Sequence, residues 1–346
     1  MPRDSSAGPV DTCGRPLRSL RISIIDRCDL RCSYCMPEEE YTWLPTADIL
    51  TFDEIEEVVE AFTRLGVNRL RLTGGEPLLR GSIVELVERL AANEALEDLA
   101  MTTNGTQLER LAAPLRRAGL QRVTVSVDSL QPDRFEQLTR RAALDSVLAG
   151  LRAAAIEGFG ALKINTVVMR GFNDDEIGEL LALARQVGAE IRFIEYMDVG
   201  GATQWSMERV VPRDEILSLV ARHGGPVTPD PVRGNAPAER FSLGDGTRFG
   251  VISSTTEPFC GQCDRSRVTA DGMWYTCLYA RDGLNLRDQL RDGISVDELE
   301  QQIRRVWQGR SDRGAEQRLQ EPQRGALYGI EELKSDPHRE MHTRGG

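Results

Sequence analysis

The sequence predicts an α/β fold: an incomplete, TIM-like (β/α)6 barrel followed by a smaller C-terminal α+β domain. Two observations predict this fold. Six short apolar strand candidates alternate with amphipathic helical stretches over residues 20–196, and such alternation gives a parallel sheet with helical crossovers. After about residue 212 the alternation stops and two hairpin signals appear. Six β/α units are too few for a closed eight-stranded barrel.

The expected elements follow from apolar periodicity and from local start and stop signals. Thr51 is a typical N-cap, and Gly66 is a typical residue just past a helix end. The expected strands are Leu20–Ile25, Asn68–Thr73, Leu99–Asn104, Arg122–Asp128, Leu162–Met169 and Ile191–Tyr196. The expected helices are Phe52–Leu65, Ser82–Ala92, Gln107–Ala118, Ser146–Glu157 and Asp174–Val187.

Polar and apolar residues alternate along these strands. In the fourth strand Thr124, Ser126 and Asp128 share one face, because successive side chains of a strand point to opposite sides. Other strands place further polar residues on one face, namely Arg21, Ser23, Arg69, Arg71, Thr73, Lys163 and Asn165. We expect the helices to cover the apolar faces and the polar faces to line a ligand cavity.

Four segments are expected along the chain. Residues 1–19 are predicted to be flexible, except near Cys13; residues 20–211 form the partial barrel; residues 212–330 form the C-terminal domain; and residues 331–346 form a tail that ends in Gly345-Gly346. The expected C-terminal elements are the hairpins Arg240–Leu243 with Arg248–Ser253 and Val268–Ala270 with Met273–Cys277, and the helix Val296–Gln308.

Composition narrows the class of protein. The chain has 346 residues, 40% of them hydrophobic and 28% charged, as in soluble globular proteins. It has no apolar run long enough for a membrane span and no secretory signal, so we expect a cytoplasmic protein with reduced cysteines. The net charge of −11 argues against nucleic-acid binding. It leaves room for an anionic small substrate, because a few clustered arginines create a local positive pocket.

Three of the seven cysteines, Cys28, Cys32 and Cys35, directly follow the first strand and are called the first triad below. Three thiolates at this spacing can hold three irons of a [4Fe–4S] cluster and leave the fourth iron open for a small molecule. A structural zinc site is the alternative, but it normally takes four protein ligands. Cys13 could supply the fourth thiolate, although a lone thiol is its simplest interpretation.

A second triad, Cys260, Cys263 and Cys277, also stops at three thiolates. Zinc is a serious alternative here, because a CxxC pair on a hairpin is common in zinc ribbons. Two sets of three favour two clusters, each with an open iron. Arg265 and Arg267 would share one face of an extended segment, an arrangement suited to clamping phosphates, although Arg-x-Arg is also common on solvated charged edges.

The first triad, with Tyr34 before its last cysteine, resembles the signature of the radical S-adenosylmethionine (SAM) superfamily. Thr73-Gly74-Gly75-Glu76-Pro77 matches that superfamily's Gly-Gly-Glu motif, in which bare backbone and a carboxylate approach the amino group of SAM. Together with Leu20–Ser23, Cys260–Arg267 and the closing Gly-Gly, these motifs resemble the GTP 3′,8-cyclase family of molybdenum cofactor biosynthesis from about residue 13 to 346.

The resemblance implies two [4Fe–4S] clusters, one on each triad, with SAM on the first and the guanine of GTP on the second. It implies that SAM contacts Tyr34, Gly75, Ser126 and Met197. It implies that GTP contacts Arg21, Arg71, Thr102, Lys163, Arg265 and Arg267, with Arg69 and Arg192 as helpers. The bottom-up alternation independently supports Arg21, Arg71, Ser126 and Lys163.

The implied enzyme is a lyase that makes (8S)-3′,8-cyclo-7,8-dihydroguanosine 5′-triphosphate from GTP. In the implied reaction a 5′-deoxyadenosyl radical removes the C3′ hydrogen, the ribose radical adds to C8 of guanine, and the product radical is then reduced and protonated. The implied partners are an electron donor, the downstream cyclic pyranopterin monophosphate synthase and a second copy of the chain, with no nucleic acid or membrane. Arg344 stands where an apolar residue is expected in the tail.

Two other functions remain open at this point. A radical SAM peptide-modifying maturase would also carry an auxiliary cluster after its barrel, although such proteins usually have more than three C-terminal cysteines and no need of Arg265 and Arg267. A binding or scaffold protein stabilised by structural zinc belongs to a different class. Metal analysis separates it from the enzymes, because each cluster contributes about four irons.

Overall fold

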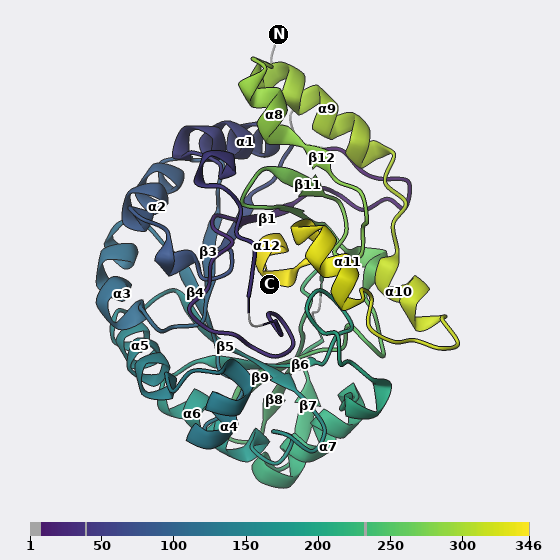
Figure 1. The fold of residues 1–346 in the computed structure, drawn as a ribbon. Coiled ribbons are helices and arrows are strands. Elements are labelled where there is room, and N and C mark those ends of the chain that lie inside the picture. Colours follow the sequence, from purple (N-terminus) through teal and green to yellow (C-terminus); the bar gives the residue numbers. More distant parts are fainter. Residues whose placement is uncertain (1–7, 39, 232–233, 346) are drawn as a thin grey trace.

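A computed structural model describes residues 8–38, 40–231 and 234–345, and it shows one continuous sheet wrapped around a central space (Figure 1). Six parallel strands form the middle of the sheet, each hydrogen-bonded to the next in chain order. They are β1 (Ser19–Ser23), β2 (Arg69–Thr73), β3 (Asp98–Thr103), β4 (Arg122–Ser126), β5 (Ala161–Val168) and β6 (Glu190–Glu195). All six predicted strands, and the partial barrel, are thus confirmed.

The helices of the barrel lie on the outside of the sheet (Figure 1). Five were predicted: α1 (Phe52–Arg64), α2 (Ile83–Ala91), α3 (Leu108–Arg117), α5 (Leu144–Ile156) and α6 (Ile177–Gln186). Thr51 caps α1 as expected, since its hydroxyl accepts a hydrogen bond of 3.2 Å from the Glu54 amide. Two helices were missed, α4 (Pro132–Thr139) and α7 (Arg213–Gly224). α4 begins at Pro132, and α7 directly follows Pro212. A proline is favourable at the start of a helix, but in a sequence it also suggests a loop, which is why both helices were missed.

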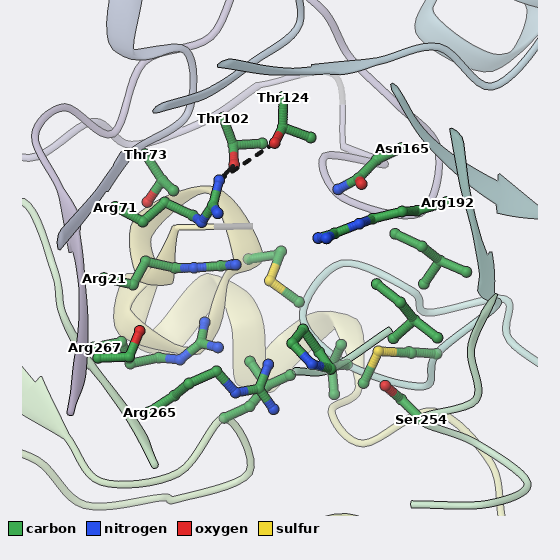
Figure 2. A pocket seen from close by; sticks show the side chains of 18 of the residues that line it. Arg21, Arg71, Thr73, Thr102, Thr124, Asn165, Arg192, Ser254, Arg265 and Arg267 are labelled. Carbon is green, nitrogen blue, oxygen red and sulfur yellow. Dashed lines mark hydrogen bonds between the residues drawn. The ribbon is translucent and has the colours of Figure 1, made fainter. Parts of the chain in front are cut away.

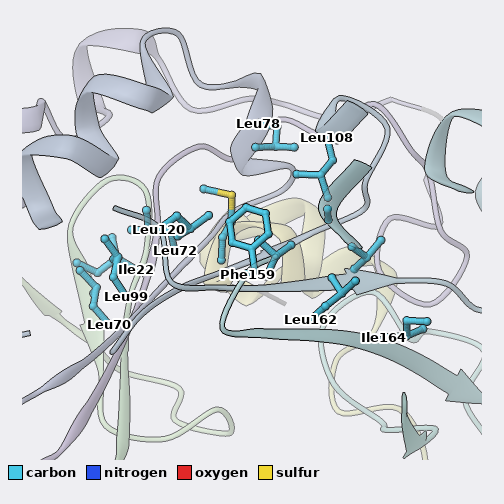
Figure 3. Close-up of a cluster of buried hydrophobic side chains, with 14 of the residues drawn as sticks. Ile22, Leu70, Leu72, Leu78, Leu99, Leu108, Leu120, Phe159, Leu162 and Ile164 are labelled. Carbon is cyan, nitrogen blue, oxygen red and sulfur yellow. The ribbon is translucent and has the colours of Figure 1, made fainter. Parts of the chain in front are cut away.

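The core lies between the sheet and these helices (Figure 3). The apolar residues of the strands point outward into it, and Ile22, Leu72, Val123 and Ile164 are fully buried. Burying one such side chain contributes about 1.5–3 kcal/mol. Because helices cover the apolar faces of the strands, the polar faces of the same strands point to the inside of the barrel.

The two predicted C-terminal hairpins are confirmed, and they extend the barrel sheet at both of its ends. The strands are β7 (Val227–Pro229), β8 (Glu239–Leu243), β9 (Arg248–Ile252), β10 (Arg265–Val268), β11 (Met273–Tyr275) and β12 (Leu284–Asn285). β9 runs parallel to β6, and β10 runs parallel to β1 with Arg267 opposite Arg21. The C-terminal α+β part therefore supplies walls of the central space, while a domain boundary near residue 212 stays a prediction.

The remaining helices belong to the C-terminal part. They are α8 (Leu286–Arg291), α9 (Val296–Gln308), α10 (Gly314–Leu319), α11 (Ile330–Ser335) and α12 (Met341–Arg344), of which α9 was predicted. Short 3₁₀ turns lie at Thr46–Asp48, Pro77–Leu79, Met207–Arg209, Cys260–Gln262 and Pro337–Arg339. The tail, with α11 and α12, lies in the middle of the barrel mouth (Figure 1).

The N-terminal segment packs against the C-terminal part. Residues 1–7 of the predicted flexible segment lie outside the described residues, whereas Asp11, Arg15 and Leu17 are buried. In the described ranges, no helix combines the length and the apolar character that crossing a membrane requires.

Candidate active site

One cavity of about 610 Å³ inside the barrel is lined by both cysteine triads. Every site residue predicted from the sequence borders this cavity. They are Arg21, Cys28, Cys32, Tyr34, Cys35, Arg69, Arg71, Gly75, Thr102, Ser126, Lys163, Arg192, Met197, Cys260, Cys263, Arg265, Arg267 and Cys277. Residues separated by up to about 250 positions in sequence thus meet at one place, and the role of each remains a proposal.

The first triad sits on the loop that follows β1. A tight turn holds this loop, because the amides of Cys35 and Met36 both donate to the Cys32 carbonyl, at 2.9 and 2.7 Å. Burial raises the pKa of the Cys28 thiol to about 12, with a further contribution from Glu76, and it also raises the pKa of Cys32 and Cys35. Buried thiolates therefore need a cationic partner. The irons of a cluster supply that charge, so these three residues fit a cluster.

The Gly-Gly-Glu segment passes directly behind the first triad. A Cβ atom on Gly75 would lie 2.3 Å from the Arg27 carbonyl oxygen, so only glycine allows this approach. The Glu76 carboxylate, expected near the amino group of SAM, is fully buried. It accepts hydrogen bonds from the Thr103 hydroxyl at 2.7 Å and the Asn104 amide at 2.6 Å, so it serves to fix the loop after β3.

The second triad lies across the cavity, among arginines. Burial alone would raise the pKa of Cys263, but Arg265 and Arg310 reverse this effect and lower it to about 7. This thiol is thus prepared to ligate a metal as the thiolate. Among the residues that the structure describes, no group of three histidine, cysteine or acidic side chains is arranged to bind a single metal ion. Three free thiols at one cavity wall fit a cluster.

Four arginines converge between the triads. Figure 2 shows Arg21, Arg71, Arg265 and Arg267 reaching into the pocket from one side and facing Arg192 on the other. Arg71 donates to the hydroxyls of Thr102 and Thr124, at 3.2 and 3.4 Å. Within the described part of the chain, Arg21, Arg71, Arg265 and Arg267 form no salt bridge with a carboxylate. Positive charge therefore dominates this group, although, against the effect of burial, the neighbouring Cys263 thiol and Asp264 carboxylate raise the pKa of Arg265.

Mutual repulsion confirms how closely these cations are gathered. Burial, and then Arg267 and Arg71, lower the pKa of Arg21 well below its usual value. Burial also lowers the pKa of Arg71 and of Arg267 to about 10. Burial of several like charges is costly unless an anion joins them, so the arrangement is suited to binding a polyanion.

The other predicted cations are partly neutralised. Arg192 donates to Glu190 at 2.8 Å, Lys163 lies 3.9 Å from the same carboxylate, and Arg69 pairs with Asp264. Burial, followed by Arg192, lowers the pKa of Lys163 to about 7. Lys163 is therefore the cation of this site whose charge changes near neutral pH.

The C-terminal tail closes the arginine side of the cavity. The Gly345 carbonyl accepts hydrogen bonds from Arg21 at 3.0 Å and from Arg267 at 3.3 Å. Arg344, which replaces an expected apolar residue, fits because it is buried and donates to the carbonyls of Leu278 and Ala280, both at 2.9 Å. Gly346 lies outside the described residues.

Two neighbours of the first triad were not singled out from the sequence. The Asn104 amide lies 3.8 Å from the Cys28 sulfur and donates to Asp29 at 2.7 Å. Asp128 accepts from the Tyr34 hydroxyl at 2.6 Å, which holds the aromatic ring of the signature. Asp128 was placed on the correct strand face, but Asn104 follows its strand and only the position at a strand end could have indicated it.

The comparisons with known proteins first define the class. Residues 22–184 match the family model described as the radical SAM superfamily, and residues 189–316 match the model described as Molybdenum Cofactor Synthesis C. The two triads therefore fall one in each matched region.

The relatives then define the family. The chain is 52% identical over 340 residues to GTP 3′,8-cyclase 3 of Mycobacterium bovis, and the aligned region covers 97% of this chain and 90% of the relative. It is 44% identical over 313 residues to GTP 3′,8-cyclase of Aquifex aeolicus, covering 90% and 95%. The chain belongs to the GTP 3′,8-cyclase family of radical SAM proteins. The predicted family and its cofactors, two [4Fe–4S] clusters and SAM, are thereby confirmed.

Solved structures agree on the fold. Streptococcus suis SuiB bound to S-adenosylmethionine matches with a TM-score of 0.58 at 17% identity, covering 84% of this chain and 68% of SuiB. Native anSMEcpe with bound AdoMet matches with a TM-score of 0.54 at 16% identity, covering 78% of each chain. At such low identity the likeness concerns the fold alone, so the peptide-modifying alternative is not favoured over the family of the much more similar cyclases.

Proposed function

We propose that this protein is a GTP 3′,8-cyclase, a lyase that converts GTP to (8S)-3′,8-cyclo-7,8-dihydroguanosine 5′-triphosphate in molybdenum cofactor biosynthesis. The observation that carries the proposal is the group of four arginines that converge between two cysteine triads in one cavity. A triphosphate is the kind of polyanion that such a group selects. The family's relatives are named for this activity.

The chain's own residues would divide the work between two ends of the cavity. When bound, the first cluster and SAM supply a 5′-deoxyadenosyl radical that takes a hydrogen atom from the ribose. Tyr34, Gly75, Ser126 and Met197 would hold SAM beside Cys28, Cys32 and Cys35.

At the other end, Arg21, Arg71, Thr102, Lys163, Arg265 and Arg267 would hold GTP, assisted by Arg69 and Arg192. Fixing the nucleotide at several points matters, because a reaction between two bound partners depends steeply on their relative position. The second triad would hold the cluster that binds guanine.

The surroundings of the reaction are also part of the proposal. We place the enzyme in the cytoplasm, where its seven free thiols stay reduced. It would act as a homodimer, receive electrons from a donor protein and deliver its product to the downstream cyclic pyranopterin monophosphate synthase.

The decisive experiment is anaerobic cluster reconstitution followed by reductant, SAM and GTP, with mass spectrometry of the products. We expect about eight irons per chain, 5′-deoxyadenosine, and a dihydro nucleotide isomeric with GTP. The alanine variant of Cys263 serves as the matched control and should form no cyclised nucleotide. Cleavage of SAM that ignores GTP and leaves the nucleotide unchanged would refute the proposal.

A further inference from the structure

A buried network of two arginines and two aspartates lies behind the second triad, and nothing in the proposed catalysis uses it. Asp11 and Arg15 come from the N-terminal segment, and Arg310 and Asp312 follow α9. Asp11, Arg15 and Arg310 are at most 5% exposed. Arg15 Nε donates to Asp11 Oδ2 at 2.5 Å, and Arg310 Nε donates to Asp312 Oδ2 at 3.0 Å.

The network contacts two cysteines of the second triad and the residue that precedes the third. Arg15 Nη1 donates to the Cys260 carbonyl at 3.0 Å, and Arg310 Nη1 donates to the Cys263 carbonyl at 2.9 Å. Asp312 accepts a hydrogen bond of 2.8 Å from the hydroxyl of Thr276, the residue before Cys277. The turn that holds Cys260 and Cys263 and the segment before Cys277 are thus tied to one group.

Further contacts hold the network itself in place. The Arg310 guanidinium lies 4.4 Å from the centre of the Trp307 ring, and the Trp307 indole donates to the Arg15 carbonyl at 3.1 Å. Arg15 and Arg310 also line the cavity beside the triad. Arg15 Nη2 is buried and has no hydrogen-bond partner within the described ranges. It is therefore an unsatisfied donor near the cavity wall that carries the second triad.

We propose that Asp11, Arg15, Arg310 and Asp312 position the second cluster: they fix the backbone of Cys260 and Cys263 and the Thr276 side chain before Cys277, and the Arg310 guanidinium beside Cys263 favours the cluster's reduced state. The proposal rests on the second cluster of the proposed function. Hydrogen bonds and net charge around an iron–sulfur cluster set its reduction potential. A buried cation lowers the energy of the added electron, and a buried carboxylate raises it.

The test is a redox titration of the reconstituted protein, monitored by electron paramagnetic resonance and accompanied by iron analysis. Each variant is also made in a background lacking the first triad, so that the signal of the second cluster is observed alone. In Arg310→Gln, the reduced-to-oxidised ratio at the parent's midpoint should fall at least about tenfold, or ~59 mV for one electron. Loss of only the second cluster's roughly four irons would support the proposal equally.

Three further variants distinguish an electrostatic effect of the network on the second cluster from a purely structural effect. Arg310→Lys keeps the charge, so we expect a midpoint close to the parent's. Asp312→Asn removes a carboxylate, so the midpoint should move in the opposite direction, to higher potential. Arg304→Gln alters an arginine of α9 that pairs with Glu300, and it should change neither cluster.

The proposal is overturned if Arg310→Gln and Arg15→Gln both retain about eight irons with the parent's spectrum and midpoint. It is also overturned if Asp312→Asn shifts the midpoint in the same direction as Arg310→Gln. Neither readout uses GTP. A parent that holds both clusters but does not convert GTP would therefore refute the proposed function and leave this test in force.

Discussion

The two ends of the cavity hold the same ligand type, three cysteines, in opposite electrostatic surroundings. At the first triad a carboxylate, that of Asp128, borders the cavity and is held by Tyr34. At the second triad the neighbours are Arg265, Arg267 and Arg310. Burial raises the pKa of Cys28 to about 12 at one end and also raises the pKa of Cys260 at the other, but there Arg265 and Arg310 lower the pKa of Cys263 to about 7.

This difference separates what each end can bind. SAM carries a sulfonium, an ammonium and a carboxylate group, so its net positive charge suits the end where the Asp128 carboxylate borders the cavity. GTP carries a triphosphate, so it suits the cationic end. A cavity with the same sign of charge at both ends would not distinguish the ends, and it would repel the ligand whose net charge has that sign. If the proposed roles of the two ends hold, the polarity of the site would place SAM and GTP before the reaction begins.

The largest effect should come from removing one cysteine at each end. Cys32→Ala should lose about four of eight irons and abolish formation of 5′-deoxyadenosine. Cys263→Ala should lose a similar amount of iron, abolish nucleotide cyclisation and keep the spectrum of the first cluster. Iron analysis and product chromatography distinguish the two variants. Identical losses of both activities would show that the ends do not act separately.

The next effect concerns the arginines. Arg267→Ala should weaken GTP binding about 10- to 100-fold, because a hydrogen bond to a charged group contributes about 1.5–3 kcal/mol. Arg265→Ala should act in the same direction. Equilibrium binding of GTP to the reconstituted protein measures the change, with Arg304→Ala on α9 as the control. Unchanged GTP affinity in both variants would refute the clamp, provided that the iron content equals the parent's.

A smaller effect is expected at the other end. Asp128→Asn removes the negative charge there and leaves a weaker acceptor for the Tyr34 hydroxyl. We expect SAM affinity to fall about tenfold, equivalent to about 1.4 kcal/mol, while GTP affinity stays the same. Titration of each ligand alone checks this. A variant that loses GTP affinity instead would reverse the assignment of the two ends.

The smallest effect is a dependence on pH. Because the pKa of Lys163 is lowered to about 7, its side chain is mainly protonated below pH 7 and mainly neutral above it. A bound anion favours the protonated form, so binding above pH 7 requires proton uptake. GTP affinity should fall with rising pH by up to about tenfold per unit.

The comparison variant for this effect is Lys163→Gln. It should bind GTP more weakly at pH 6 and lose this part of the pH dependence, whereas the ionisation of the nucleotide is common to both proteins. Parallel affinity profiles of parent and variant between pH 6 and 9 would exclude Lys163 as the group responsible.

Much of the barrel could be predicted because its signals are local. The alternation of side chains along a strand is enough to place Arg71 and Lys163 on the inner face of the sheet. The first triad is equally local, because its three cysteines lie within eight residues of sequence. The helix α9 was predicted from a similarly local period.

The features that could not be predicted depend on contacts between distant segments. Asp11 and Arg310 meet across 299 positions of sequence and lack any motif. Arg344 looked out of place because its burial depends on carbonyls of the Cys277 loop, 64 to 66 residues earlier. Glu76 was correctly located in its motif, but the direction of its carboxylate is decided by the loop after β3.

The pairing of β10 with β1 has a consequence for how the molecule matures. Residues 265–268 lie opposite residues 19–22, so one wall of the barrel joins only after nearly 250 intervening residues have been made. Pairing over such a separation is slow to form. We therefore expect β10 to join the sheet late, which would leave the loop of Cys28 accessible for cluster insertion until then. Pulsed hydrogen exchange should find β10 protected after β2–β5, and simultaneous protection would contradict this order of assembly.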